Sequence, residues 1–402
     1  MTHLDRDGFS ASESALGYLY QSRFALYQLL KFPEEYAVLI EKDDDLDFSD
    51  EQGHKTLASL KHKKPGERLT DLSTDFWKSV RIWLSRYKAS GRISSHLQFF
   101  LYTTNETAAD SFLSSLIPLE RSDISTILEK AEEALADSAA RIIVPIKEEF
   151  DLLSEDEKKD FLKRIFIFDN SPRIDDLPDL IIKQHMRMIR SEFRQSAFER
   201  LEGWWNELVI KLLTNTRVKE VYGHEISDKL SSINNEYRAD NLPIDFRGKK
   251  PDGEIDVDND TRLFVVQLKK LGLSPARIER AICNYYRAFN QRSAWARENV
   301  LLEGEVEIYE ELLVDEWSEY KEVAFEKIKD DSSEDMMQKA GRDLYNWAQF
   351  ETDRLRIRPE VSEPYVVRGN FHILANEKPL PRIYWHPLFL ERLKQILLQE
   401  SV

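Results

Sequence analysis

The order of helix-like and strand-like segments in the first 105 residues is the feature that most constrains the fold of this chain. Apolar residues recur at helical spacing in two segments, and three shorter segments are apolar, β-branched and aromatic, as strands are. In chain order the segments are a helix over 11–31, strands over 36–42 and 55–63, a helix over 70–90 and a strand over 96–104. This order predicts a small α/β sandwich core.

The remaining chain is expected to be mostly helical. Residues 43–54, between the first two strands, predict a strand end and a polar hairpin loop. Further segments are a strand-like run at 165–169, long helices at 274–299, 304–329 and 334–354, short strand-like pieces at 364–374 and 381–385, and an amphipathic helix at 387–398. We therefore expect an α/β domain with helical additions over 1–215, and a mainly helical module with a few short strands over 216–402.

Charge is distributed unevenly along the chain. The net charge is −16, from 57 Lys and Arg against 73 Asp and Glu, whereas proteins that bind DNA through its phosphates are usually basic. Residues 52–92 nevertheless hold ten Lys or Arg and three acidic residues, net +7. Residues 303–339 hold fourteen acidic residues and four lysines, net −10. The average argues against nucleic-acid binding, but the basic N-terminal region keeps it open; both regions are also explained by solvated helix faces.

Cysteine usage and hydropathy indicate the cellular compartment of the protein. Cys283 is the single cysteine, so no internal disulfide forms, as is usual in a reducing compartment. The sequence has no apolar run of about 18 residues, and its first ten residues are polar. We expect a cytoplasmic protein that does not contact a membrane.

Four polar residues near the first two strands form a candidate catalytic set. Glu41 and Asp45 are four residues apart, and Ser59 and Lys61 are two apart. Side chains alternate faces with a period of two, so each pair shares a face, and a hairpin would bring the pairs together. Carboxylates hold Mg²⁺, which activates water for phosphodiester hydrolysis, and a lysine stabilises the developing charge. The alternative is a solvated hairpin loop with an ordinary strand-end lysine.

A family resemblance favours the catalytic interpretation. Roughly residues 10–215, with the motifs in the first 105, resemble the double-stranded-DNA nuclease domain of the PD-(D/E)xK superfamily found in bacterial defence effectors, a restriction-endonuclease-like fold. The matching segments are GYLYQ (17–21), IEKDDDLDF (40–48), LASLKHK (57–63), LTDLSTDFWKSVRIW (69–83) and FFLYTTN (99–105). The resemblance implies that Asp45 or Asp44 binds the metal, with Glu41 upstream, Lys61 as the motif lysine and Gln21 as part of the Tyr-Gln pair.

The resemblance also implies a reaction and a cofactor. The reaction is hydrolysis of double-stranded DNA with little sequence preference, and the cofactor is Mg²⁺, with Mn²⁺ as the alternative ion. Ser59 departs from the family, which often has Gln or Glu two residues before the lysine; a serine hydroxyl is a weaker, neutral ligand. The cations expected to bind DNA are Lys61, Lys63, Lys64, Arg68, Lys78 and Arg81.

The second half resembles the C-terminal module of the nuclease subunits of ABC-three-component, or Lamassu, anti-phage systems. The matching segments are ERAICNYYRAFNQRSAW (279–295), EIYEELLVDEW (307–317), VVRGNFHILAN (366–376) and YWHPLF (384–389). This resemblance implies an SMC-like ABC ATPase that senses aberrant DNA and a small middle subunit as partners. The net charge of −16 with a single basic face leads us to expect a homo-oligomer when active, because several copies would multiply phosphate contacts. A degenerate, non-enzymatic adaptor and an RNA-cutting effector of the same fold are the alternatives.

One further motif competes with the first. Glu254 and Asp256, followed by Gln267 and Lys269, match the acid-acid-Gln-x-Lys pattern better than the N-terminal set. The neighbouring residues match the C-terminal module rather than a nuclease core. We therefore expect residues 262–273 to pack within that module.

Overall fold

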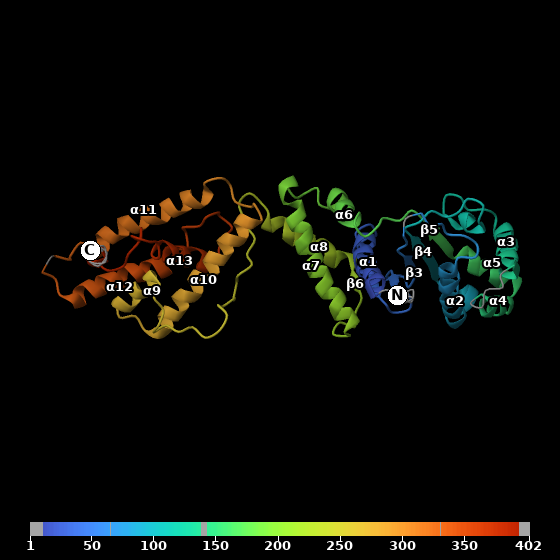
Figure 1. Cartoon of the computed structure of the whole chain (residues 1–402), viewed down its shortest axis with the longest axis horizontal. Helices are drawn as coiled ribbons and strands as arrows, with labels where there is room; N and C mark the ends of the chain where they lie inside the picture. The colour runs from blue at the N-terminus through green and yellow to red at the C-terminus, as the bar shows by residue number, and fades with distance from the viewer. Residues whose placement is uncertain (1–10, 65, 138–142, 330, 394–402) are drawn as a thin grey trace, which may run out of the picture. The chain divides into compact units, whose positions relative to one another are not determined.

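The computed structural model describes residues 11–64, 66–137, 143–329 and 331–393 (Figure 1). By its internal contacts the chain divides into two compact units, Met1–Ile233 and Asn234–Val402. The division falls within helix α8 (Gly223–Glu236), later than the boundary expected after residue 215. A strand at Val221–Tyr222 that pairs with the first sheet explains why the N-terminal unit extends past residue 215.

The N-terminal unit contains a mixed six-stranded sheet in the order β5-β4-β3-β2-β1-β6. Its strands are β1 (Ala37–Ile40), β2 (Leu46–Ser49), β3 (Lys55–Lys61), β4 (Leu97–Thr103), β5 (Ile165–Phe168) and β6 (Val221–Tyr222). Strands β1, β2 and β3 form an antiparallel meander, and β3, β4 and β5 run parallel. The expectation of a loop over 43–54 is wrong, because β2 lies inside that range and separates β1 from β3.

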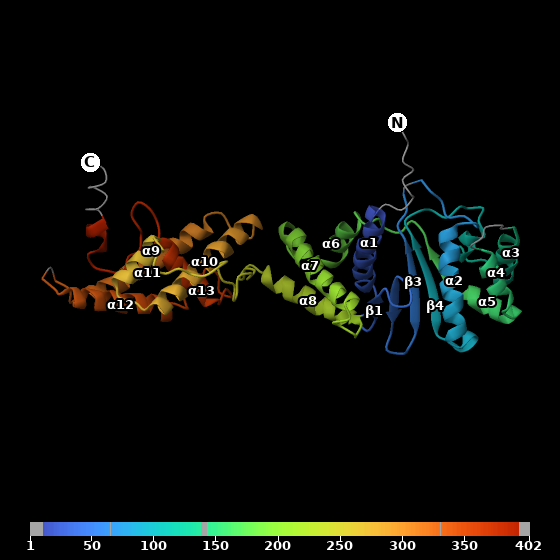
Figure 2. The same cartoon turned by 60° about the horizontal axis from the view of Figure 1, so that its bottom comes forward.

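Helices cover both faces of this sheet. They are α1 (Ala11–Leu29), α2 (Thr74–Ala89), α3 (Ile124–Asp137), α4 (Val144–Asp151), α5 (Glu155–Lys163), α6 (Leu177–His185), α7 (Arg194–Leu213) and α8, with 3₁₀ turns η1 (Arg92–Ser94), η2 (Phe112–Leu116) and η3 (Ser191–Phe193). Leu57 and Phe99 point into the core beneath α2, whereas Tyr102 of β4 packs against Phe24 of α1, with ring centroids 4.8 Å apart. Figure 2 shows α1 and α2 on opposite sides of the sheet.

The described residues of the C-terminal unit form helices and loops, with no strand. Its helices are α9 (Leu263–Lys270), α10 (Pro275–Arg297), α11 (Glu305–Phe325), α12 (Glu334–Phe350) and α13 (Pro364–Leu374). The strand-like piece predicted at 364–374 is wrong: Val366, Val367, Asn370 and Phe371 are buried at helical spacing, and Pro364 suits the first turn of a helix. The piece at 381–385 is not a strand either. Of the helix predicted at 387–398, residues 389–393 are helical, and the part after residue 393 lies outside the described residues.

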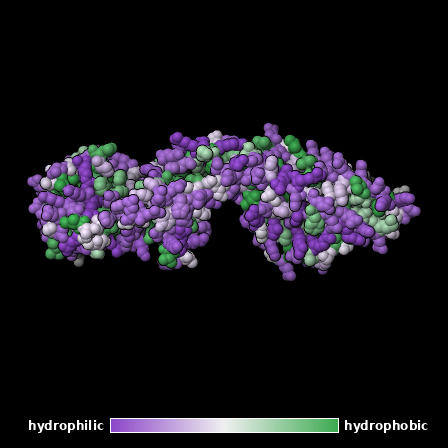
Figure 3. Space-filling model, turned by 180° about the vertical axis from the view of Figure 1, so that it is seen from behind, coloured by the Kyte–Doolittle hydropathy of each residue, from purple (hydrophilic) through white to green (hydrophobic). Residues whose placement is uncertain are grey.

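The surface gives no indication of a membrane span. Within the described residues, every helix is too short or too polar to cross a bilayer. Figure 3 shows one face of the chain, on which hydrophilic residues predominate and hydrophobic residues form scattered patches. Single exposed apolar side chains, such as Val218 at 85% exposure, are ordinary on a folded protein.

Close packing of α13 on α10 yields the first prediction. A Cβ added at Gly369 of α13 would lie 2.3 Å from the backbone oxygen of Asn284 and 2.4 Å from Cβ of Ala288, both on α10. Gly369→Ala should therefore lower the free energy of unfolding by about 1–3 kcal/mol, measured by urea denaturation. The matched control is Gly203→Ala in α7, where nothing lies within 4 Å and alanine should stabilise by about 0.4–1 kcal/mol. Equal effects of the two substitutions would contradict this account of the α10–α13 contact.

Candidate active site

A tight turn between β1 and β2 carries the acidic residues of the candidate site. The amide of Glu41 donates to the carbonyl of Asp45 over 3.0 Å, and Ile40 pairs with Leu46. Glu41 adopts a left-handed backbone with φ of 56°, an uncommon conformation for a residue with a side chain. Glu41 and Asp45 thus occupy the two ends of a turn, and the expectation that they share one face of a strand and its end is wrong.

A buried carboxylate beneath the turn fixes its shape. Asp47 of β2 is 3% exposed and accepts hydrogen bonds from the amides of Asp43 and Asp44, each over 3.1 Å. Its carboxylate also lies 3.1 Å from the ammonium of Lys55 on β3. Burial raises the pKa of Asp47, while the adjacent Lys55 opposes that shift. Sequence reasoning missed Asp47, because an alternating strand pattern does not reveal a charge on its buried face.

Asp45 connects the turn to α1 and β3. Its carboxylate accepts hydrogen bonds from the amide nitrogen of Gln21 over 3.0 Å and from the backbone amide of Leu60 over 2.6 Å. The hydroxyl of Ser59 lies 3.4 Å from the same carboxylate. The structure therefore brings together Gln21, Asp45 and Ser59, which lie on three separate segments of the sequence.

Glu41 completes the acidic part of the cluster. The pKa of Glu41 is raised above its usual value. Desolvation is the largest cause and the charge of Asp45 adds to it, whereas a hydrogen bond from Gln21 and the charge of Lys61 lower the pKa. The side-chain oxygen of Gln21, Oε1, is buried and has no hydrogen-bond partner among the described residues. A buried acceptor without a donor is costly, so this oxygen suits a water or a cation.

Asp44 faces α2. One of its oxygens accepts from the indole nitrogen of Trp83 over 2.6 Å, and the other accepts from the amide of Asp45 over 2.9 Å. Burial, reinforced by the charge of Asp45, raises the pKa of Asp44 to about 6. Protein donors occupy both oxygens of Asp44 and both oxygens of Asp45, but only Asp45 is linked to Lys61 through the Ser59 hydroxyl. Of the two candidates for a metal-binding aspartate, the geometry favours Asp45.

Ser59 and Lys61 share one face of β3, as the period of two predicts. The ammonium of Lys61 donates to Oγ of Ser59 over 3.0 Å, and the hydroxyl of Ser79 on α2 donates to the same oxygen over 2.8 Å. Ser79 and Trp83 were missed as site residues, because their apolar neighbours on α2 indicated a helix face of the core. Their spacing of four residues was the available signal.

Four of the six cations expected to bind DNA line two separate grooves, three in one and Arg81 in the other. Lys61, Lys63 and Arg68 line a groove of about 130 Å³ beside the start of α2. Lys63 and Lys78 both pair with Asp75, and the distance from Lys78 to Asp75 is 3.6 Å. Arg68 lies 3.4 Å from Glu106, and Lys64 is exposed in the loop after β3.

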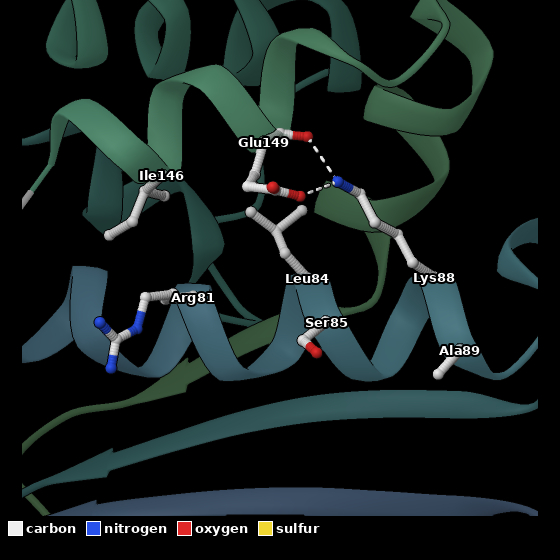
Figure 4. Close-up of a pocket in the computed structure, with 7 residues that line it drawn as sticks. All are labelled: Arg81, Leu84, Ser85, Lys88, Ala89, Ile146 and Glu149. Atoms are coloured by element: carbon white, nitrogen blue, oxygen red, sulfur yellow. Dashed lines mark hydrogen bonds and ion pairs between the residues drawn. The ribbon is translucent and has the colours of Figure 1, made fainter.

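Arg81 lines a different groove, of about 620 Å³, formed by α2 and α4. Figure 4 shows Arg81 on α2 across from Ile146, and farther along the groove Lys88 bonds to the carboxylate and backbone oxygen of Glu149. Arg81 therefore does not share the groove beside Lys61.

The oxygen donors define which metal the site could accept. The described residues contain no group of three His, Cys, Asp or Glu side chains that could hold an ion. The donors near Lys61 are the carboxylates of Asp45 and Glu41 and the free Oε1 of Gln21. Mg²⁺ is commonly bound by one or two carboxylates and keeps several waters. The donor set therefore fits a partly hydrated Mg²⁺ and does not fit a closed cage of protein ligands.

The competing motif does not form such a cluster. Gln267 and Lys269 lie on α9, a helix, and Gln267 is buried with bonds to the backbone of Ala375 and Trp385. Lys269 donates to backbone carbonyls, including that of Asp258 over 2.8 Å. Asp256 binds the side chain of Asn259. These contacts agree with the expected packing role of residues 262–273.

Three resemblance segments of the C-terminal unit meet through polar contacts. Arg292 of α10 donates to Asn370 of α13 over 2.9 Å and to Glu310 of α11 over 2.6 Å. His372 of α13 is fully buried, and neither ring nitrogen has a hydrogen-bond partner among the described residues. Burial lowers the pKa of His372 to about 3, so its ring is neutral.

Solved structures offer only distant resemblance. The Cap4 SAVED/CARF-domain containing receptor of Moraxella osloensis has 12% identity and a TM-score of 0.34, over 69% of this chain and 68% of that chain. The Acinetobacter baumannii Cap4 receptor with the cyclic trinucleotide 2'3'3'-cAAA has 13% identity and a TM-score of 0.35, over 72% and 67%. TM-scores this low support no conclusion about fold or function. No curated protein matches the sequence.

The C-terminal unit has a clear family match. Residues 264–393 match C-terminal domain 7 of the ABC-three component (ABC-3C) systems. This range begins in α9 and contains α10 to α13, together with the Arg292, Glu310 and Asn370 contacts. By this match, residues 264–393 of the C-terminal unit are similar to a domain of the ABC-three component systems.

Proposed function

We propose that the chain is the Mg²⁺-dependent double-stranded-DNA endonuclease of an ABC-three component defence system, with a PD-(D/E)xK active site in its N-terminal unit. The observation that carries the proposal is the position of Asp45, whose carboxylate lies between Gln21 of α1 and the Ser59–Lys61 pair of β3. Aspartate, glutamate and lysine in this arrangement suit phosphodiester hydrolysis.

Each residue has a chemical role in this proposal. A bound Mg²⁺ would supply Lewis acidity and lower the pKa of a coordinated water. Asp45 and Glu41 would hold it, and Gln21 Oε1 would accept a hydrogen bond from one of its waters. The Lys61 ammonium would orient the attacking water and offset the charge that develops on the phosphate. Lys63 and Arg68, in the adjoining groove, would bind neighbouring phosphates.

The C-terminal unit suggests the assembly in which cutting is controlled. An SMC-like ABC ATPase would sense aberrant DNA, and a small middle subunit would complete the complex. The acidic stretch 303–339, net −10, includes α11 and suits docking to a basic partner surface. The same charge disfavours DNA binding outside the nuclease groove.

One specific observation favours a second candidate, a catalytically silent adaptor. Ser59 stands where the resemblance expects Gln or Glu, and the described residues lack a group of three metal-binding side chains. In that case the N-terminal unit would only tether partners. Nucleic-acid cleavage by the purified chain separates the two candidates, and an RNA substrate beside DNA identifies the nucleic acid that is cut.

The second prediction concerns catalysis. Asp45→Asn and Lys61→Ala should each abolish Mg²⁺-dependent cutting of linear and supercoiled DNA while the fold is retained. The physical reason is that one loses a metal ligand and the other the cation beside the reacting phosphate. Cleavage is measured on gels with and without Mg²⁺, and the fold is checked by circular dichroism.

The matched control for the lysine is Lys269→Ala, from the competing motif, whose ammonium contacts only backbone carbonyls. It should cut like the wild type. Loss of cutting in Lys269→Ala with activity retained in Lys61→Ala would move the active site to the C-terminal unit. A wild-type chain that cuts neither DNA nor RNA, alone or with its partners, would favour the adaptor.

The third prediction tests the structural role of Asp44. An aspartate in an unfolded chain titrates near a pKa of about 3.9, whereas folding raises the pKa of Asp44 to about 6. Because the folded state favours the protonated form, the contribution of Asp44 to stability falls as pH rises between these values and stays low above them. Asp44→Asn should therefore gain stability relative to the wild type between about pH 4 and pH 6. Urea unfolding of both proteins across this range measures the difference, and a difference independent of pH would contradict the assignment.

The fourth prediction concerns assembly. The cations of the groove are partly neutralised by Asp75 and Glu106, so a single chain should bind DNA weakly. Several copies would multiply phosphate contacts, and we expect the active species to be a homo-oligomer. Mass and nuclease activity, measured together over a concentration series, should rise in parallel. Full activity from a species that stays monomeric on DNA would refute this expectation.

A further inference from the structure

We propose that Ser79 of α2 is a positioning residue for Lys61 and acts through the hydroxyl of Ser59, which serves as a hydrogen-bond centre and not as a metal ligand. The proposal rests on the function proposed above and specifies how this site works with serine at position 59. It concerns a buried pair of hydroxyls that the expected motif does not contain.

Ser59 and Ser79 form a closely spaced pair between β3 and α2. Their hydroxyl oxygens are 2.8 Å apart, and the two residues are 2% and 1% exposed. Lys61 donates to the Ser59 oxygen over 3.0 Å, and Asp45 lies on its other side at 3.4 Å. The Ser59 oxygen is thus the shared atom between the lysine, the aspartate and α2.

Counting protons and lone pairs shows what Ser59 can do. A hydroxyl has one proton and two acceptor lone pairs. Accepting from Lys61 and from Ser79 uses both lone pairs, and donating to Asp45 uses the proton. Ser79 could instead donate its proton to the backbone carbonyl of Asp75 at 3.2 Å. Donation to Ser59 is favoured, because the series of hydrogen bonds then ends on the carboxylate of Asp45, a stronger acceptor than a carbonyl. In this arrangement Ser59 has no lone pair left for a metal.

One face of α2 contacts the candidate site through four side chains, one on each successive turn of the helix. Asp75 pairs with Lys63, and Ser79 bonds Ser59. Farther along the same face, the Trp83 indole donates to Asp44, and Arg86 lies 3.0 Å from Asp43. The spacing of three or four residues puts these side chains on one helix face. Ser79 is therefore part of a regular contact between α2 and the site. Its hydroxyl is the group of this face that bonds to β3, the strand that carries Lys61.

The hydroxyl pair holds Lys61 without adding a negative charge. A Glu at position 59 would ligate the metal and also pair with the lysine. Here Asp45 and Glu41 remain the two charged ligands, and the ammonium is held by a neutral oxygen that α2 fixes in place. Removing Ser79 should loosen the ammonium in the catalytic step and leave DNA binding unchanged.

The test compares Ser79→Ala, Ser59→Ala and the double variant of the full chain, with Ser115→Ala as control. Ser115 is likewise a buried serine of the N-terminal unit, and its hydroxyl bonds only the Phe112 carbonyl. Ser79→Ala should lower kcat on the order of tenfold with KM for DNA unchanged, as loss of an outer hydrogen bond typically does. In the Ser59→Ala background it should have no further effect, because its partner is absent. Ser115→Ala should leave kcat unchanged.

Mg²⁺ titration by calorimetry gives a readout independent of cutting. Ser59→Ala should bind Mg²⁺ like the wild type, whereas Asp45→Asn should bind it much more weakly. Equal losses of Mg²⁺ affinity in both variants would make Ser59 a ligand and overturn the proposal. So would additive effects of the two serine substitutions on kcat, or a wild-type kcat in Ser79→Ala.

The outcomes also separate this proposal from the proposed function. If the wild type binds Mg²⁺ but cuts neither DNA nor RNA, the nuclease function fails. The Ser59–Ser79 contact is then judged by Mg²⁺ affinity and by the double-variant cycle in free energy of unfolding. Independent contributions of the two serines to stability would overturn the contact as well.

Discussion

The carboxylate of Asp47 is the constraint on which the candidate site depends. It is buried in β2, where an unpaired charge would be costly, and the amides of Asp43 and Asp44 together with Lys55 compensate it. These bonds set the path of the turn that follows Glu41. Because the turn has this path, Asp45, which follows Asp44, reaches the backbone amide of Leu60 and the side-chain amide of Gln21. The candidate ligands are thus held by backbone geometry, not by the cation that they would bind.

Helix α2 supplies the second level of organisation. Its apolar side, including Phe76 and Val80, packs into the core on one face of the sheet. Its polar stripe meets the turn and the end of β3 through Ser79 and Trp83. A single helix therefore anchors the core and holds the site. Substitutions on its polar stripe are expected to affect chemistry, and those on its apolar side stability.

The C-terminal unit is stabilised by a different mixture of contacts. Gly369 allows α13 to approach the backbone of α10, and Arg292 ties α10 to α11 and α13. The buried side chain of Gln267 donates a hydrogen bond to the backbone carbonyl of Ala375 and accepts one from the backbone amide of Trp385. These bonds explain why a glutamine occupies a buried position of α9. The motif that looked catalytic by sequence is thus accounted for by hydrogen bonding inside the C-terminal unit.

The sequence alone determined the two helices α1 and α2 and the strands β1, β3 and β4 around the site, the shared face of Ser59 and Lys61, and the packing role of residues 262–273. These features follow from local periodicity and composition, which record backbone repeat and burial. The sequence did not reveal β2 or the helix α13, because a four-residue strand between polar turns and a helix containing Val366 and Val367 both give misleading local patterns. Only the tertiary structure showed that Asp45 is linked to Lys61 through the Ser59 hydroxyl, and that Ser79 bonds Ser59. Those assignments depend on which hydrogen-bond partners distant segments bring within about 3 Å, and local sequence pattern carries no record of such partners.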